Sequence, residues 1–158
     1  MSGSVLVITY HAVDHGAGPL SIAPELLREQ LDQIVEAGVP VLTIREVAGR
    51  LGAAALPQRA VALTFDDGFA SVAERAAPLF AERGLRATVF AVAGAVGRTN
   101  AWPTQAPGTP VEPLAGAEQL RALAAAGWEV GSHGTRHAPL ARVSGAEARA
   151  EIVDSRLA

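Results

Sequence analysis

Short apolar runs alternate with longer amphipathic stretches along the whole chain. Five runs rich in Val, Ile, Leu and Ala have the length of buried strands, over residues 5–10, 39–43, 60–65, 88–92 and 128–132. Between them, apolar residues recur at helical spacing and glycines end the stretches. This spacing predicts a helix that opens within residues 21–25 and ends at Gly38, and helices over 44–51, 70–83, 116–126 and 144–158. The β-α alternation predicts a parallel sheet with helices outside it, in a barrel or a doubly wound arrangement.

The 158 residues suit one domain, but the number of predicted strands does not settle whether the sheet closes into a barrel. Five strands do not close a barrel, and the last helix has no strand to return to. A compact five-stranded domain would explain this ending, and so would a truncated product.

Polar side chains follow two of the predicted strands. Asp66 and Asp67 come directly after residues 60–65, and His133 and His137 follow residues 128–132. The carboxyl ends of parallel strands meet at one edge, which is where α/β folds build their sites. Three of these groups could ligate a divalent metal while the spare carboxylate acts on a metal-bound water, the minimum for metal-assisted hydrolysis.

Each half of this cluster also has a simpler explanation. A histidine pair four positions apart can lie on a helix surface or in a hydrogen-bonded loop, and an Asp-Asp-Gly turn can merely end a strand. Adjacent carboxylates repel, however, and a cation holds both ionised. Successive strand residues point to opposite sides, so we expect one carboxylate to ligate the metal while the other faces the attacking water.

Composition removes several other chemistries. The chain has no Cys, which excludes thiolate nucleophiles, disulfides and Cys-ligated metals. All 13 basic residues are Arg, so there is no P-loop lysine and no Schiff base. The net charge of −3, without a basic run, argues against nucleic acid or an anionic membrane surface as a partner.

The N-terminus has no basic start, and its apolar run is shorter than a signal peptide needs. No apolar stretch reaches the roughly 18 residues of a membrane span. We therefore expect a cytoplasmic chain. A removed leader would leave no trace, so action outside the cell or in its envelope stays open.

These motifs resemble those of the polysaccharide deacetylases of carbohydrate esterase family 4, whose domain is a distorted (β/α)7-type barrel. Residues 64–68, Thr-Phe-Asp-Asp-Gly, look like the first family motif, and Ser132-His133 with His137 looks like the second. The resemblance implies that Asp67, His133 and His137 bind the metal and that Asp66 is the general base. Gly134 stands where the family more often has Ser or Thr.

The start of the chain resembles the circularly permuted subgroup that deacetylates poly-N-acetylglucosamine. Residues 8–11, Ile-Thr-Tyr-His, carry this likeness, and in that subgroup an N-terminal Tyr-His supplies the general acid. His11 is then the expected acid, unless it only makes a backbone contact. His15 has no family counterpart and is assigned to a loop. Trp102, expected to be exposed in the proline-rich segment 94–113, could stack on a sugar or form a hydrophobic lid.

The resemblance implies an enzyme that removes acetyl groups from an N-acetylated amino-sugar polysaccharide or oligosaccharide. Its cofactor would be one divalent ion, zinc by default, with cobalt, nickel, iron or manganese also suited to N and O ligands. Alternatives are an O-acetyl esterase, another C–N hydrolase or a non-catalytic glycan-binding domain. Family members continue past residues 151–153 into a further strand and an oxyanion-hole motif, so we expect residues 1–158 to be an incomplete deacetylase domain without turnover of its own. The oligomeric state stays open.

Overall fold

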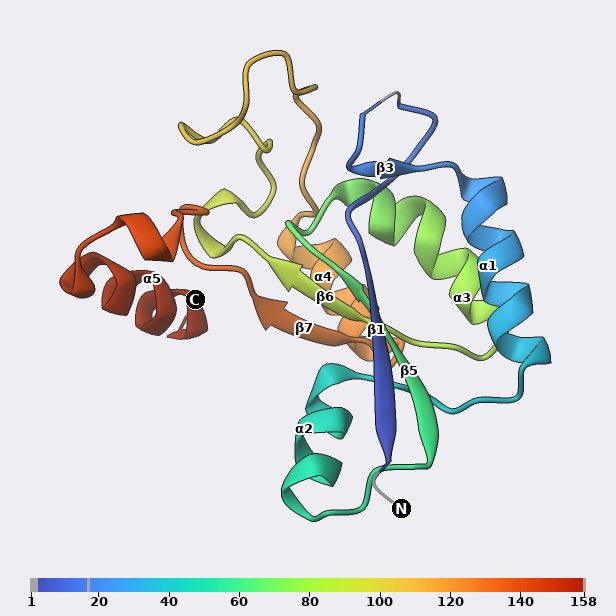
Figure 1. Ribbon diagram of the computed structural model, residues 1–158. Coiled ribbons are helices and arrows are strands. Elements are labelled where there is room, and N and C mark those ends of the chain that lie inside the picture. Colours follow the sequence, from blue (N-terminus) through green and yellow to red (C-terminus); the bar gives the residue numbers. More distant parts are fainter. Residues whose placement is uncertain (1–2, 17, 158) are drawn as a thin grey trace.

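The computed structural model describes residues 3–16 and 18–157, and a parallel sheet runs through its centre (Figure 1). The strand order is β1-β5-β6-β7, and β4 also pairs with β5. These strands are β1 (Ser4–Tyr10), β4 (Val41–Leu42), β5 (Arg59–Phe65), β6 (Thr88–Ala91) and β7 (Glu129–Ser132). All five predicted strands are thereby confirmed. The parallel α/β architecture is that of a barrel left incomplete within the described residues.

Strand β5 is the centre of the sheet. It pairs with β1 along its whole length, while its other edge is shared by β4 at the start and β6 at the end. A separate pair of two-residue strands, β2 (Ala12–Val13) and β3 (Ser21–Ile22), was not predicted. The helix expected to open within residues 21–25 is confirmed, since it begins at Pro24 and has Glu25 in its first turn, shortly after Ser21 and Ile22 of β3.

Helices lie on both sides of the sheet in Figure 1, with α1 and α3 at the right and α5 at the left beside β7. The α-helices are α1 (Pro24–Glu36), α2 (Ile44–Gly52), α3 (Ala77–Ala81), α4 (Ala117–Ala125) and α5 (Gly145–Leu157). Shorter turns are the π-helix η1 (Val72–Ala76) and the 3-10 helices η2 (Ala93–Ala95) and η3 (Leu140–Arg142). The predicted helix over 70–83 is therefore interrupted by a π-helical turn. Within the described residues, every helix is too short or too polar to cross a membrane.

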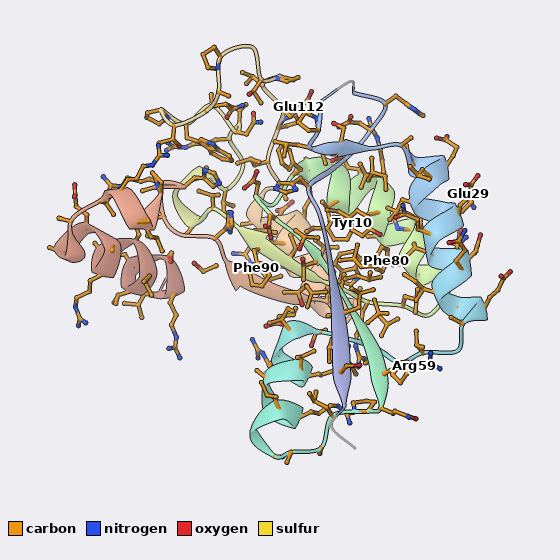
Figure 2. All side chains as sticks on the ribbon, viewed as in Figure 1. Tyr10, Glu29, Arg59, Phe80, Phe90 and Glu112 are labelled. Atoms are coloured by element: carbon orange, nitrogen blue, oxygen red, sulfur yellow. The ribbon has the colours of Figure 1, made fainter. Side chains whose placement is uncertain are left out.

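Four aromatic side chains pack together in the core around Phe65, at the end of β5. Phe65 packs with ring-centroid distances of 5.3 Å to Tyr10, 5.8 Å to Phe80 and 5.7 Å to Trp128. Figure 2 shows Tyr10 and Phe80 on the side of the sheet that α1 and α3 cover. Because aromatic side chains bury large areas in fixed geometry, this cluster gives β5 a rigid end from which the next turn departs.

The strand register brings the predicted site residues to one edge. Tyr10 pairs with Phe65, and Ala91 pairs with Ser132. The residues that follow β1, β5 and β7 therefore emerge at the same end of the sheet. The expectation that the polar clusters share one edge is confirmed.

Candidate metal centre

The turn after β5 separates the two adjacent carboxylates. We expected the alternation of strand side chains to separate Asp66 from Asp67, but β5 ends at Phe65, so this alternation does not extend to either residue. Asp67 instead has a φ of 68°, in the left-handed region, and is buried, whereas Asp66 is half-buried. Gly68 continues the turn with a φ of 75°, and a Cβ there would lie 3.1 Å from the Ala91 backbone. Glycine is required here by both conformation and space.

Two imidazoles converge on one oxygen of Asp67. The Oδ1 atom lies 3.4 Å from His133 Nε2 and 3.3 Å from His137 Nε2. One ligand atom from each residue can be chosen so that all three lie within 4.8 Å of one another. Asp67 comes from the end of β5 and the histidines from the loop after β7, so the tertiary structure assembles the predicted set.

Hydrogen bonding within the described residues leaves this cluster unsatisfied. Asp67 Oδ1 and His137 Nδ1 are two of the three buried side-chain polar atoms without a partner there; the third is Gln105 Oε1. A buried polar atom without a partner is costly, and a bound cation would satisfy the carboxylate oxygen. One carboxylate and two imidazoles form a donor set suited to a divalent transition metal such as zinc.

Backbone strain is concentrated at the same residues. Among the described non-glycine residues, only Asp67, His137 and Ala54 have a positive φ, and that of His137 is 57°. Such conformations cost about 1–3 kcal/mol each and gather at functional sites, where the surrounding structure maintains them. The strain therefore supports a functional role for this cluster.

The loop between the two histidines lies against the end of β6. The peptide N–H groups of Ala93 and Gly94 donate to the carbonyl oxygens of Gly134 and Thr135, each at 2.9 Å. A Cβ on Gly94 would come within 2.5 Å of the Thr135 oxygen, so this close approach requires glycine. Gly94, which was predicted only as part of a loop, thus helps Ala93 to hold the histidine segment.

His11 lies at the same edge of the sheet, where it follows β1 as Asp66 follows the neighbouring strand β5. The Asp66 N–H donates to the carbonyl oxygen of Tyr10 at 2.9 Å, so His11 follows directly beside Asp66. The segment after it is anchored at Val13, whose N–H donates to Ser71 Oγ at 3.0 Å and whose carbonyl accepts from Arg75 at 2.9 Å. His11 itself is half-buried.

His15 lies apart from this cluster. It is exposed and 3.8 Å from Glu25, whose side chain is exposed to the same 71% extent. Its assignment to a loop agrees with the structure.

Trp102, in the long segment between η2 and α4, contacts the cluster. Figure 1 shows this segment as a loop that extends away from the sheet at the top of the view. The Trp102 ring stacks on that of His137, with centroids 4.3 Å apart and planes inclined by 25°. The expectation of an exposed Trp102 was wrong, because this contact leaves the side chain half-buried. Buried Asn100 shapes the loop by donating to Pro110 O at 3.1 Å and accepting from Glu112 N at 2.7 Å.

A family model described as polysaccharide deacetylase matches residues 53–158, two thirds of the chain. The chain belongs to the polysaccharide deacetylase family. The matched stretch contains all three residues of the candidate metal centre and Asp66. His11 lies outside it.

Individual relatives agree with this family. The Bacillus subtilis protein YxkH, named as a polysaccharide deacetylase, is 22% identical over 95% of this chain and 49% of its own length. The structure of IcaB from Ammonifex degensii is similar with 30% identity and a TM-score of 0.71, covering 84% of this chain and 54% of IcaB. The deacetylase PplD of Streptococcus pyogenes, solved with acetate, shares the fold at 24% identity and a TM-score of 0.77, covering 96% of this chain and 65% of PplD. The chain therefore spans about half to two thirds of these proteins.

Proposed function

We propose that this polysaccharide deacetylase domain removes acetyl groups from an N-acetylated amino-sugar polymer, with a divalent ion held by Asp67, His133 and His137. The observation that carries the proposal is the buried, unpartnered Oδ1 of Asp67 facing two imidazole nitrogens at 3.3 and 3.4 Å. Membership of the deacetylase family supports acetyl hydrolysis as the reaction.

The ion, when bound, supplies Lewis acidity and makes a coordinated water easier to deprotonate. The protein supplies the proton transfers. Asp66, half-buried beside the ligand Asp67, accepts a proton from the attacking water as the new C–O bond forms. His11 donates a proton to the amine nitrogen as the C–N bond breaks, so that acetate and a free amino sugar leave. The hydrogen bond from Asp66 N to Tyr10 O supports this division, because it sets the base and the acid on neighbouring strand ends.

Trp102 contributes to the rim of the proposed site. Its contact with His137 supports a lid over the metal ligands, and its remaining exposed surface suits stacking on a sugar ring. Zinc is the default ion for one carboxylate and two imidazoles, although cobalt, nickel, iron and manganese accept the same donors.

Acetate release tests the proposal. Protein in the longest form that its gene encodes is stripped of metal, reloaded with Zn²⁺ or Co²⁺, and incubated with N-acetylglucosamine oligomers or with O-acetylated xylan. We expect metal-dependent acetate release from the N-acetyl substrate, and its loss in Asp66→Asn. Release from the O-acetyl substrate alone would identify an esterase. Tight glycan binding without acetate from either substrate would indicate a binding domain and contradict the proposal.

A further inference from the structure

A buried carboxylate of the last helix holds the segment that joins the two histidines. Glu151 of α5 is only 1% exposed. Its Oε2 accepts the backbone N–H groups of Thr135 at 2.8 Å and Arg136 at 2.9 Å, and its Oε1 accepts Arg136 Nε at 2.7 Å. A carboxylate this deeply buried is rare without such partners.

The segment is therefore held from two sides. Ala93 and Gly94 donate to the carbonyl oxygens of Gly134 and Thr135, while Glu151 accepts the N–H groups on the other side. The peptide groups between the histidines are thus fixed by elements distant in sequence. This explains how the chain maintains the strained φ of 57° at His137.

The same contact explains the glycine after His133. Gly134 has a φ of 80°, and a Cβ there would lie 3.0 Å from Glu151 Oε2. A side chain at this position would press on the carboxylate that holds the loop. The absence of a side chain at Gly134 therefore leaves room for the Glu151 carboxylate.

Glu151 is ionised when it makes these contacts. Burial alone would raise the pKa of its carboxyl, but the hydrogen bonds from Arg136 and Thr135 outweigh burial and lower the pKa below its ordinary value. The peptide N–H groups therefore face a full negative charge, which makes these hydrogen bonds stronger than neutral ones.

We infer that Glu151 is a positioning residue of the metal centre, which sets His133 and His137 at the spacing that a divalent ion requires. This inference rests on the proposed metal site. Glu151 acts through the backbone of Thr135 and Arg136, which lie between the two ligand histidines. Groups that orient metal ligands typically change metal affinity by 10–100-fold when they are removed.

Cobalt titration tests this inference, with the visible absorption of bound Co²⁺ reporting affinity and geometry. Glu151→Gln keeps the size of the side chain but removes its charge and one acceptor. We expect it to bind Co²⁺ at least about tenfold more weakly than the wild type, with an altered spectrum. Glu151→Asp keeps the charge but has a shorter reach, so it should also bind more weakly.

Glu147→Gln is the matched control. Glu147 accepts the N–H and hydroxyl of Ser144 at the start of the same helix, so its loss weakens α5 without touching the loop backbone. We expect this variant to lose thermal stability but to retain wild-type Co²⁺ affinity. Wild-type affinity and spectrum in folded Glu151→Gln or Glu151→Asp would overturn the inference, as would an equal loss of affinity in Glu147→Gln. Failure of the wild type itself to bind Co²⁺ would instead overturn the proposed metal site, and the inference with it.

Discussion

The indole of Trp102 stacks on the imidazole of His137 at a centroid distance of 4.3 Å, although the two residues lie 35 positions apart in the sequence. His133 adjoins the same stack, with its ring centroid 5.1 Å from that of His137. The Trp102 ring therefore lies directly beside the imidazole pair of the candidate metal centre. Trp102 is placed to report on what binds there.

Fluorescence should detect metal binding through this stack. Co²⁺ bound beside His137 should quench the emission of Trp102, because an open-shell ion quenches a ring in close contact with its ligand. Buried Trp128, in the core behind β5, should respond little. In a Co²⁺ titration we expect quenching in the wild type and in Trp128→Phe but almost none in Trp102→Phe. Equal quenching in all three proteins would show that the ion binds elsewhere.

Metal content should depend on both histidines of the cluster. We expect about one divalent ion per chain in protein purified without metal-affinity resin, and its removal by a chelator. His133→Ala and His137→Ala should each lose most of this metal, as measured by elemental analysis, because each removes one of three protein ligands. His15→Ala is the control, since His15 is exposed and paired only with Glu25. Full occupancy in either of the first two variants would disprove the site.

The two neighbouring carboxylates should differ in their effects. Asp66→Asn should retain the metal and abolish acetate release, because it removes the general base and leaves the ligands in place. Asp67→Asn should lower both metal affinity and rate, because Oδ1 faces both histidines. Metal titration and acetate assay on the same preparations provide the comparison. If the two variants behave alike, the roles assigned here are wrong.

His11 should matter for rate but not for metal binding. If it is the general acid, the active protein should show a bell-shaped pH–rate profile whose alkaline limb reflects the loss of its proton. His11→Ala should flatten that limb and lower the rate by about 10²–10⁴. Co²⁺ affinity should stay within error of the wild type. A profile that keeps its alkaline limb in this variant would assign the acid to another residue.

Acid should remove the stabilisation that Glu151 provides. Burial opposes its ionisation, but the hydrogen bonds from Arg136 and Thr135 prevail, so its pKa is lower folded than unfolded. Its contribution is therefore complete above the ordinary pKa of 4.5 and is lost as the pH falls through the lower, folded value. In urea unfolding of metal-free protein, wild type should be more stable than Glu151→Gln at pH 7, and the difference should shrink below pH 4.5. A difference that grows on acidification would contradict this assignment.

Local pattern was enough to predict most of the fold. The five strands follow from short β-branched or apolar runs, and their parallel arrangement follows from the helices between them. Two details were not predicted. Ser21 and Ile22 form a short strand that pairs with β2 before the helix begins at Pro24, and a π-helical turn lies within the predicted helix over 70–83.

The sequence by itself determined the chemical groups and the edge where they meet. Asp66 and Asp67 follow one apolar strand and His133 follows another, so a parallel sheet brings them to the same edge. Residue type and strand length are local properties, readable from neighbouring positions. They sufficed to predict the carboxylate and imidazole set.

Only the tertiary structure decided how these groups are aimed and held. The left-handed turn at Asp67 and Gly68 lies so close to Ala91 of β6 that a Cβ on Gly68 would be crowded, and the loop between the histidines is held by Glu151, 16 residues beyond Thr135. Nothing in the sequence distinguishes Glu151 from Asp154 on the same helix. Burial and hydrogen bonding distinguish it, and both depend on how distant segments pack rather than on the residues beside it.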